Sequence, residues 1–188
     1  RIAVPACEFP ANVYPFKNLE RRGVHVDYIP HNRGAVHLEA IESTIRANTR
    51  LVSLSWVQFL SGFRVDLAAA ADLCHAHDVL LGVDAIQGLG ALQLDVESAG
   101  VDFLACGSHK WLLGSQGLGF LYVTEALQER LDPPMAGWLH GPVDWEQLFD
   151  YELSFHDDAS RFHLGTMNHL GIAALHAAVR FYFRIGPE

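Results

Sequence analysis

The chain has 188 residues, about the length of one domain, and half of them are apolar while 19% are charged. This composition is sufficient for a hydrophobic core and excludes an intrinsically disordered protein. The formal net charge of −9 comes without a cluster of lysine or arginine, so neither nucleic acid nor an anionic membrane surface is expected as a partner.

No apolar run reaches the roughly 18–20 residues that a membrane-spanning helix needs, and no signal-peptide pattern opens the chain. Cysteine is sparse and odd in number, with Cys7, Cys74 and Cys106 and no CxxC pair. We therefore expect reduced thiols in a cytoplasmic protein. The chain starts at Arg1 and stops just after a predicted helix, so we expect both ends to be cuts through a larger protein.

Short apolar runs alternate with amphipathic or alanine-rich segments. The runs predict strands at Ile2–Pro5, Val24–Ile29, Leu51–Ser55, Val79–Val83, Val101–Cys106 and Leu118–Val123. The other segments predict helices at Tyr14–Arg22, His37–Ala47, Leu67–His77, Glu125–Arg130 and Asn168–Ile185. Asp66 is the expected N-cap of the third helix, and Gly23 is expected to end the first. This alternation favours right-handed crossovers, a mainly parallel sheet and a three-layer α/β/α fold.

Two parts of the chain carry no such regular pattern. Glu8–Asn12 is expected to be a loop after the first strand. Residues 135–165 are rich in aromatic residues and glycine without clear periodicity. A loop of that length inside a compact domain is usually functional or part of an interface.

Histidine and cysteine near the third helix raise the question of a metal site. Helical spacing places Cys74 and His77 on one face but turns His75 away. No second cluster has the spacing to complete a tetrahedral site, so no metal is expected.

Two chemically useful side chains follow neighbouring predicted strands. Asp84 comes directly after Val79–Val83, and Lys110 follows Val101–Cys106. In open α/β sheets ligands bind beyond the carboxyl ends of the strands. With the glycine-broken loop Gly114–Gly119 behind them, the pattern predicts a buried site made of an acid and an amine. A structural ion pair between the two, or a Schiff-base lysine that works without a cofactor, are the alternatives.

Three motifs in this region resemble one known family. Asp84–x–x–Gln87, Ser108–His109–Lys110–Trp111 and Gly117–x–Gly119 together resemble the pyridoxal-phosphate (PLP) core of the class V aminotransferase and cysteine desulfurase family. The combination is far more specific than any one of its pieces, and the resemblance covers nearly the whole chain. It implies that residues 1–188 are a partial PLP-binding large domain of the fold-type-I transferase architecture. The N-terminal phosphate loop and the C-terminal small domain would be missing.

The resemblance implies a role for each residue of the site. Lys110 would form the Schiff base with PLP and act as general acid and base. Asp84 would pair with the pyridine nitrogen, and Gln87 would donate to the 3′ oxygen of the ring. His109 and Ser108 would bind the phosphate. Without the resemblance, Asp84 reads as a turn or N-cap aspartate and Gln87 as an ordinary loop residue.

The sequence departs from the family pattern at several positions. Gly107 stands where a hydroxyl residue is common, so the phosphate role is expected of His109 more than of the shifted Ser108. Phe59 stands where many relatives offer an asparagine to the ring, and Gln58 is the weak candidate to replace it. No aromatic or histidine residue is assigned to stacking over the ring. Glu8–Asn12 resembles a segment near the rim of the family's active site, although a simple turn is the equal alternative.

A further resemblance concerns assembly. Arg161–Phe162–x–x–Gly165–Thr166 is similar to the family's R-F-E-x-G-T segment, with His163 in place of the glutamate. In relatives this threonine donates to the cofactor phosphate of the partner subunit. The resemblance thus implies a homodimer with shared active sites, which Thr166 completes. An N-cap role for Thr166 in the helix that follows is the alternative.

The activity that the resemblance favours is a class V aminotransferase acting on an amino acid as its small-molecule substrate. A cysteine desulfurase, or a related PLP-dependent lyase or epimerase, is the alternative within the family. A fragment that only binds or scaffolds is the alternative outside enzymes. Cys106 is the cysteine nearest the site, and a cysteine in a buried strand is usually inert.

Overall fold

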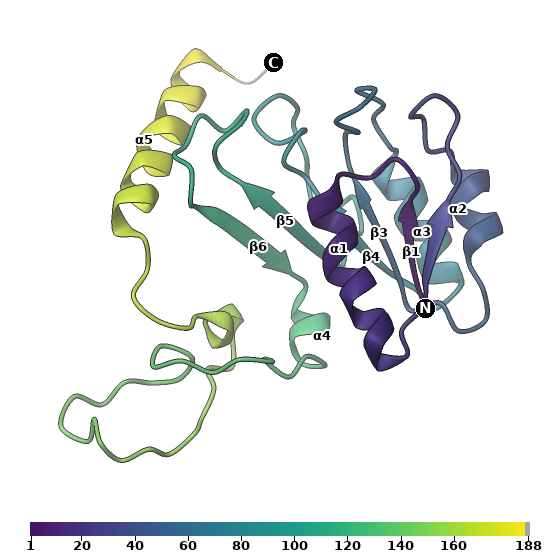
Figure 1. Ribbon diagram of the computed structural model, residues 1–188. Helices are drawn as coiled ribbons and strands as arrows, with labels where there is room; N and C mark the ends of the chain where they lie inside the picture. Colours follow the sequence, from purple (N-terminus) through teal and green to yellow (C-terminus); the bar gives the residue numbers. More distant parts are fainter. Residues whose placement is uncertain (187–188) are drawn as a thin grey trace. The chain divides into compact units, whose positions relative to one another are not determined.

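The computed structural model describes residues 1–186 and contains a six-stranded sheet in the order β2-β1-β3-β4-β5-β6. The strands are β1 (Ile2–Pro5), β2 (Val26–Ile29), β3 (Leu51–Ser55), β4 (Leu80–Asp84), β5 (Phe103–Gly107) and β6 (Gly119–Val123). Every pairing from β2 across to β5 is parallel. Figure 1 shows β6 running opposite to β5. The mainly parallel sheet predicted from the sequence is therefore confirmed.

Helices cover both faces of this sheet. The helices of residues 1–186 are α1 (Pro10–Asn18), α2 (Leu38–Thr44), α3 (Leu67–Ala76), α4 (Glu125–Gln128) and α5 (His169–Ile185), with short 3₁₀ helices at Leu19–Arg22 and Ala159–Phe162. Those that cover the sheet are α1, α2 and α3. The β1-to-β2 crossover runs across the sheet in one direction, and the β2-to-β3 and β3-to-β4 crossovers run in the other. Right-handed connections then place α1 on one face and α2 with α3 on the other (Figure 1). None of the helices in residues 1–186 has the length and apolar character that a bilayer crossing requires.

The core lies between the central strands and the helices that cover them. Val52 and Leu54 of β3 and Leu81 and Val83 of β4 give these strands one apolar face, while the opposite face carries the buried hydroxyls of Ser53 and Ser55. The fully buried side chains that form the centre of the core are Val4, Ile29, Ile41, Val52, Leu54 and Leu81. The structure confirms the predicted N-cap of α3 and the predicted end of the first helical stretch. Asp66 accepts a hydrogen bond from the Ala69 N–H at the start of α3, and Gly23 ends the first helical stretch with φ +81°.

The chain divides into two compact units. One consists of Arg1–Tyr122 together with the segment that begins at Leu170, and the other is Val123–His169. The second unit holds all of residues 135–165, and the only regular element within that range is the 3₁₀ helix Ala159–Phe162. Aromatic contacts organise it: the rings of Trp138 and Trp145 meet edge to face, and His140 lies on Phe155.

Some predicted boundaries are wrong. Glu8–Asn12 is not a loop throughout, because α1 begins at Pro10, where a proline at the first helical position loses no hydrogen bond. Strand β4 ends one residue later than expected, so Asp84 is its last residue. The predicted helix Glu125–Arg130 is shorter, and Thr124 precedes it without a side-chain cap bond.

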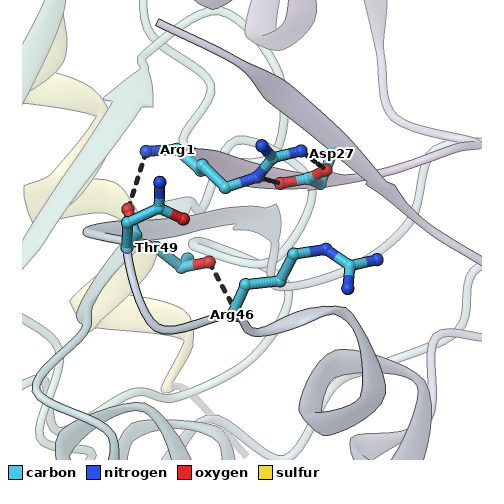
Figure 2. Close-up of polar contacts among 5 residues, drawn as sticks. Arg1, Asp27, Arg46 and Thr49 are labelled. Carbon is cyan, nitrogen blue, oxygen red and sulfur yellow. Dashed lines mark hydrogen bonds and ion pairs between the residues drawn. The ribbon is translucent and has the colours of Figure 1, made fainter.

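An ion pair joins Arg1, the residue before β1, to the neighbouring strand β2. The guanidinium of Arg1 donates through Nε and Nη2 to the two carboxylate oxygens of Asp27 in β2 (Figure 2). Figure 2 also shows the turn beside it, where Thr49 Oγ1 accepts the Arg46 N–H at 2.9 Å. The hydrogen bond from Arg1 lowers the pKa of Asp27, and burial opposes that change only in part.

The pair predicts a pH-dependent contribution to stability. Because the pKa of Asp27 is lower in the folded state, its contribution is complete above the unfolded pKa and is lost as the pH falls through the folded pKa. We expect Asp27→Asn to lower the urea midpoint at pH 7, with the difference from wild type shrinking below about pH 4. Asp78→Asn, which removes the exposed partner of Arg50, is the control and should change little. A difference that stays constant down to pH 2 would contradict the assignment.

Candidate active site

The site lies at the carboxyl edge of the parallel strands. Ser55 at the end of β3 is in register with Asp84 at the end of β4, and Asp84 is in register with Ala105 in β5. The segments that follow β1, β3, β4 and β5 therefore leave the sheet at the same edge. Five residues proposed for the site lie on two of these segments: Asp84 and Gln87 on one, and Ser108, His109 and Lys110 on the other.

Asp84 is half-buried and held through both carboxylate oxygens. Oδ1 accepts the Ile86 N–H at 2.8 Å, and Oδ2 accepts Nδ2 of Asn12 at 2.7 Å. Its main-chain carbonyl accepts the Trp56 N–H at 2.9 Å. Bonds from three segments thus fix the position and the orientation of this carboxylate.

Lys110 lies beside an aromatic ring. Its side chain is half-buried, and Nζ is 5.8 Å from the centroid of the Phe9 ring. Phe9 in turn meets Phe59 edge to face, with 5.2 Å between the ring centroids. The sequence motifs indicate no aromatic residue at the cofactor ring, because no local pattern marks a side chain such as Phe9 that reaches the site from the end of a different strand.

The charges of Asp84 and Lys110 both affect the pKa of the Cys106 thiol. Burial raises the pKa of Cys106 to about 11, the negative charge of Asp84 raises it as well, and the positive charge of Lys110 lowers it. Both charges therefore lie within electrostatic range of Cys106. Within residues 1–186, no ion pair joins Asp84 to Lys110. The structure does not favour the alternative in which the two only form a salt bridge.

Gln87 connects the segments after β4 and β5. Its Oε1 accepts the indole N–H of Trp111 at 3.3 Å. This hydrogen bond uses the amide oxygen of Gln87 and thereby orients the NH₂ group. The NH₂ group can then donate to an oxygen on a cofactor ring. The family motif predicts Gln87 in the site, and the structure shows that Trp111 holds its side chain.

Ser108 and His109 differ in environment. Ser108 is fully buried, and its Oγ lies 2.7 Å from the Ser115 carbonyl oxygen and 3.0 Å from that of Leu118. It closes the loop that returns to β6. His109 is exposed and directly precedes the lysine. The phosphate-binding roles of both residues stay predictions.

A buried polar network supports the site, and the sequence showed little of it. Glu8 is 7% exposed and lies in the turn after β1. Gln58, expected to substitute for an asparagine at the ring, is fully buried and points inward instead. Its Nε2 donates to Glu8 Oε2 at 3.2 Å, and its Oε1 accepts the Cys7 thiol at 3.7 Å. That expectation is wrong, because the buried carboxylate of Glu8 competes for the amide.

Thr166 belongs to the second unit, where its side chain is exposed. Helix α5 begins at His169, so the residue at the N-cap position is Asn168 and not Thr166. Upstream, Arg161 donates to the Gln128 carbonyl at 3.5 Å, and its guanidinium lies 6.0 Å from the Phe155 ring. The arginine of the motif thus stabilises this unit, while the threonine faces outward.

The donor set fits PLP. Asp84 offers an oriented carboxylate to a ring nitrogen, Gln87 offers an NH₂ group, and Lys110 offers a primary amine beside an aromatic ring. A parallel α/β sheet that carries such groups at its carboxyl edge defines the large-domain class of PLP-dependent transferases.

The comparisons with known proteins identify the family within that class. The family model "Aminotransferase class-V" matches residues 1–188, and the chain belongs to this family. It is 33% identical over 186 residues to a probable cysteine desulfurase of Methanothermobacter thermautotrophicus, covering 98% of this chain and 46% of the relative. It is 35% identical over 166 residues to the uncharacterized aminotransferase YcbU of Bacillus subtilis, covering 86% of this chain and 43% of the relative.

Solved structures agree with this assignment. Two structures of the cystine C–S lyase C-DES superpose with a TM-score of 0.89 at 26% identity, covering 98% of this chain and about half of theirs. One is a complex with cysteine persulfide, and the other has glycine covalently linked to the PLP cofactor. The chain spans less than half the length of the two curated relatives described above.

A glycine next to the lysine segment predicts a test of this geometry. Gly90 has φ +94°, and a Cβ there would lie 2.4 Å from the carbonyl group of Trp111. Gly23 has a similar φ of +81° with open space around it, so it is the matched control. We expect Gly23→Ala to lower the free energy of unfolding by about 1 kcal/mol, and Gly90→Ala by at least about 1 kcal/mol more. Urea unfolding measures both, and equal losses would contradict the close approach.

Proposed function

We propose that the full-length protein is a PLP-dependent enzyme that transforms an amino acid, with Lys110 as its Schiff-base lysine. One observation carries this proposal. Lys110, with Phe9 beside it, lies at the same edge of the sheet as Asp84, whose carboxylate accepts two hydrogen bonds. When bound, PLP supplies an electron sink that stabilises negative charge developing on the substrate. The family membership and the PLP-linked structural neighbour support the same cofactor.

Each residue then has a defined task. Asp84 holds a proton on the pyridine nitrogen, and the NH₂ group of Gln87 donates to the 3′ oxygen. His109, and with less support Ser108, binds the phosphate. Lys110 Nζ carries a proton to and from the α-carbon of the substrate as general acid and base. Phe9 shields one side of the lysine from water.

Two reactions fit this core. We put an aminotransferase first, because the segments around Glu8 and Trp56 resemble the class V aminotransferase group and the B. subtilis relative carries that name. The M. thermautotrophicus relative favours a cysteine desulfurase. All three cysteines of this chain are buried, with the pKa of Cys74 raised to about 12 and that of Cys7 raised as well. A sulfur-carrying thiolate would therefore have to come from outside these residues. Sulfide release from L-cysteine, set against amino transfer to a 2-oxo acid, distinguishes the two reactions.

We also propose that these residues are the partial large domain of that enzyme, acting in a homodimer in the cytoplasm. The family's R-F-E-x-G-T segment supports the dimer, since Arg161 and Thr166 match it and Thr166 is exposed. The three free thiols agree with a reducing compartment.

Covalent trapping tests the lysine. Full-length protein is loaded with PLP, reduced with borohydride, digested and mapped by mass spectrometry. We expect the label on Lys110, and Lys110→Ala should lose both the label and at least about 10²-fold in turnover. Lys17→Ala is the control, because Lys17 is exposed and paired with Glu20. A label on any other lysine would overturn the site, and no uptake of PLP would favour a scaffold.

Subunit mixing tests the shared site. Lys110→Ala and Thr166→Ala each impair every site of their own homodimers. In a mixed dimer, one site combines the intact lysine of one subunit with the intact threonine of the other. We therefore expect random mixing to restore activity to about a quarter of the wild-type value, because half of the dimers each regain one of two sites. If mixing restores nothing beyond the average of the two variants, Thr166 serves its own subunit or no site.

A further inference from the structure

The amide of Asn12 lies between two carboxylates. Its Nδ2 is 2.7 Å from Asp84 Oδ2 and 3.4 Å from Glu8 Oε1. An amide NH₂ group has two hydrogens, so these contacts use both of them. Glu8 lies in the turn after β1, Asn12 lies in the first turn of α1, and Asp84 ends β4. One side chain thus joins two carboxylates that are far apart in the sequence.

Glu8 is a rigid support for this bridge. Its Oε1 accepts the Phe9 N–H at 2.8 Å and Ser55 Oγ at 2.6 Å. Its Oε2 accepts the Ser55 N–H at 2.8 Å and Gln58 Nε2 at 3.2 Å. A buried carboxylate with this many donors has one orientation that satisfies them all, and its desolvation is offset only in that orientation.

Asp84 has less support of its own. Apart from Asn12, its carboxylate accepts only the Ile86 N–H of the next turn among the bonds seen in residues 1–186. That bond holds Oδ1, and Oδ2 is held by Asn12 alone. Rotation about the Cβ–Cγ bond is therefore restricted by Asn12, and the position of Asn12 is restricted by Glu8.

We propose that Asn12 is a positioning residue that transmits the rigidity of Glu8 to Asp84. It sets the angle at which the Asp84 carboxylate meets the pyridine nitrogen, which decides how well that ring proton is held. The inference rests on the proposed PLP function. It assigns to Asn12 a task that the resemblance of Glu8–Asn12 to the rim of the family's active site does not specify.

The same bonds also hold the start of α1 on the sheet, so a loss of stability alone does not test the idea. A purely structural Asn12 would alter the unfolding temperature but leave the bound cofactor's electronic state unchanged. A positioning Asn12 would alter the pH at which the visible absorption band of bound PLP changes. Its effect would also depend on whether Asp84 is ionisable.

The experiment uses full-length wild type, Asn12→Ala, Asp84→Asn and the double variant. PLP is the probe, and affinity and the pH profile of the absorption band are measured by titration. We expect Asn12→Ala to raise the Kd for PLP about tenfold and to shift the pH profile, consistent with one lost charge-assisted hydrogen bond. In the Asp84→Asn background the same change should have little further effect, because Asn12 acts through Asp84. Asn18→Ala, at the exposed end of the same helix, is the matched control and should bind as wild type does.

The outcomes separate this inference from the proposed function. If the wild type takes up no PLP at Lys110, the proposed function fails. If the wild type binds PLP while Asn12→Ala keeps its affinity and pH profile, the positioning role is wrong. Effects that add fully in the double variant would also overturn it. Should Asn12→Ala fail to fold, Asn12→Ser is read by the same criteria, since it keeps a short polar side chain that cannot bridge both carboxylates.

Discussion

A carboxylate buried where parallel strands end must be surrounded by donors, and Glu8 has five of them within hydrogen-bond distance. These donors come from β3, from the segment after it and from the start of α1. Because the cost of burying the charge is offset only when all of them are in place, Glu8 fixes the relative positions of these segments. Asn12 extends that constraint to Asp84. The orientation of the carboxylate proposed to meet the cofactor therefore depends on a residue 72 positions away in the sequence.

Close packing of loops provides the second constraint. The segment with Lys110 is held from three directions: Gly90 lies against the main chain of Trp111, Gln87 bonds the indole of Trp111, and Ser108 closes the loop that leads to β6. These contacts fix the position of the Lys110 segment, and the Lys110 side chain stays half-buried. A half-buried amine beside the ring of Phe9 stays accessible to a small molecule and is partly shielded from water.

The residues proposed to meet the cofactor do not by themselves select a reaction. The family includes proteins named as desulfurases and as aminotransferases, and this chain is similar to both. Reaction type depends on the groups that meet the substrate, since PLP supports several outcomes from one electron sink. None of the three buried cysteines of this chain is suited to act as a nucleophilic thiolate, because burial raises the pKa of each thiol.

The sequence alone determined the mainly parallel α/β architecture and singled out the residues proposed for the site. Apolar runs located all six strands to within two residues, and Asp84, Gln87 and Lys110 were recognisable from their motifs. Only the tertiary structure decided what holds them. Asn12 and Asp84 are 72 positions apart, and Glu8 and Ser55 are 47 apart. Periodicity reports which face of an element is buried, whereas contacts over such separations depend on register and on competition among polar groups. That competition turned Gln58 inward, and the tertiary fold brought Phe9 to Lys110; no local pattern in the sequence records either contact.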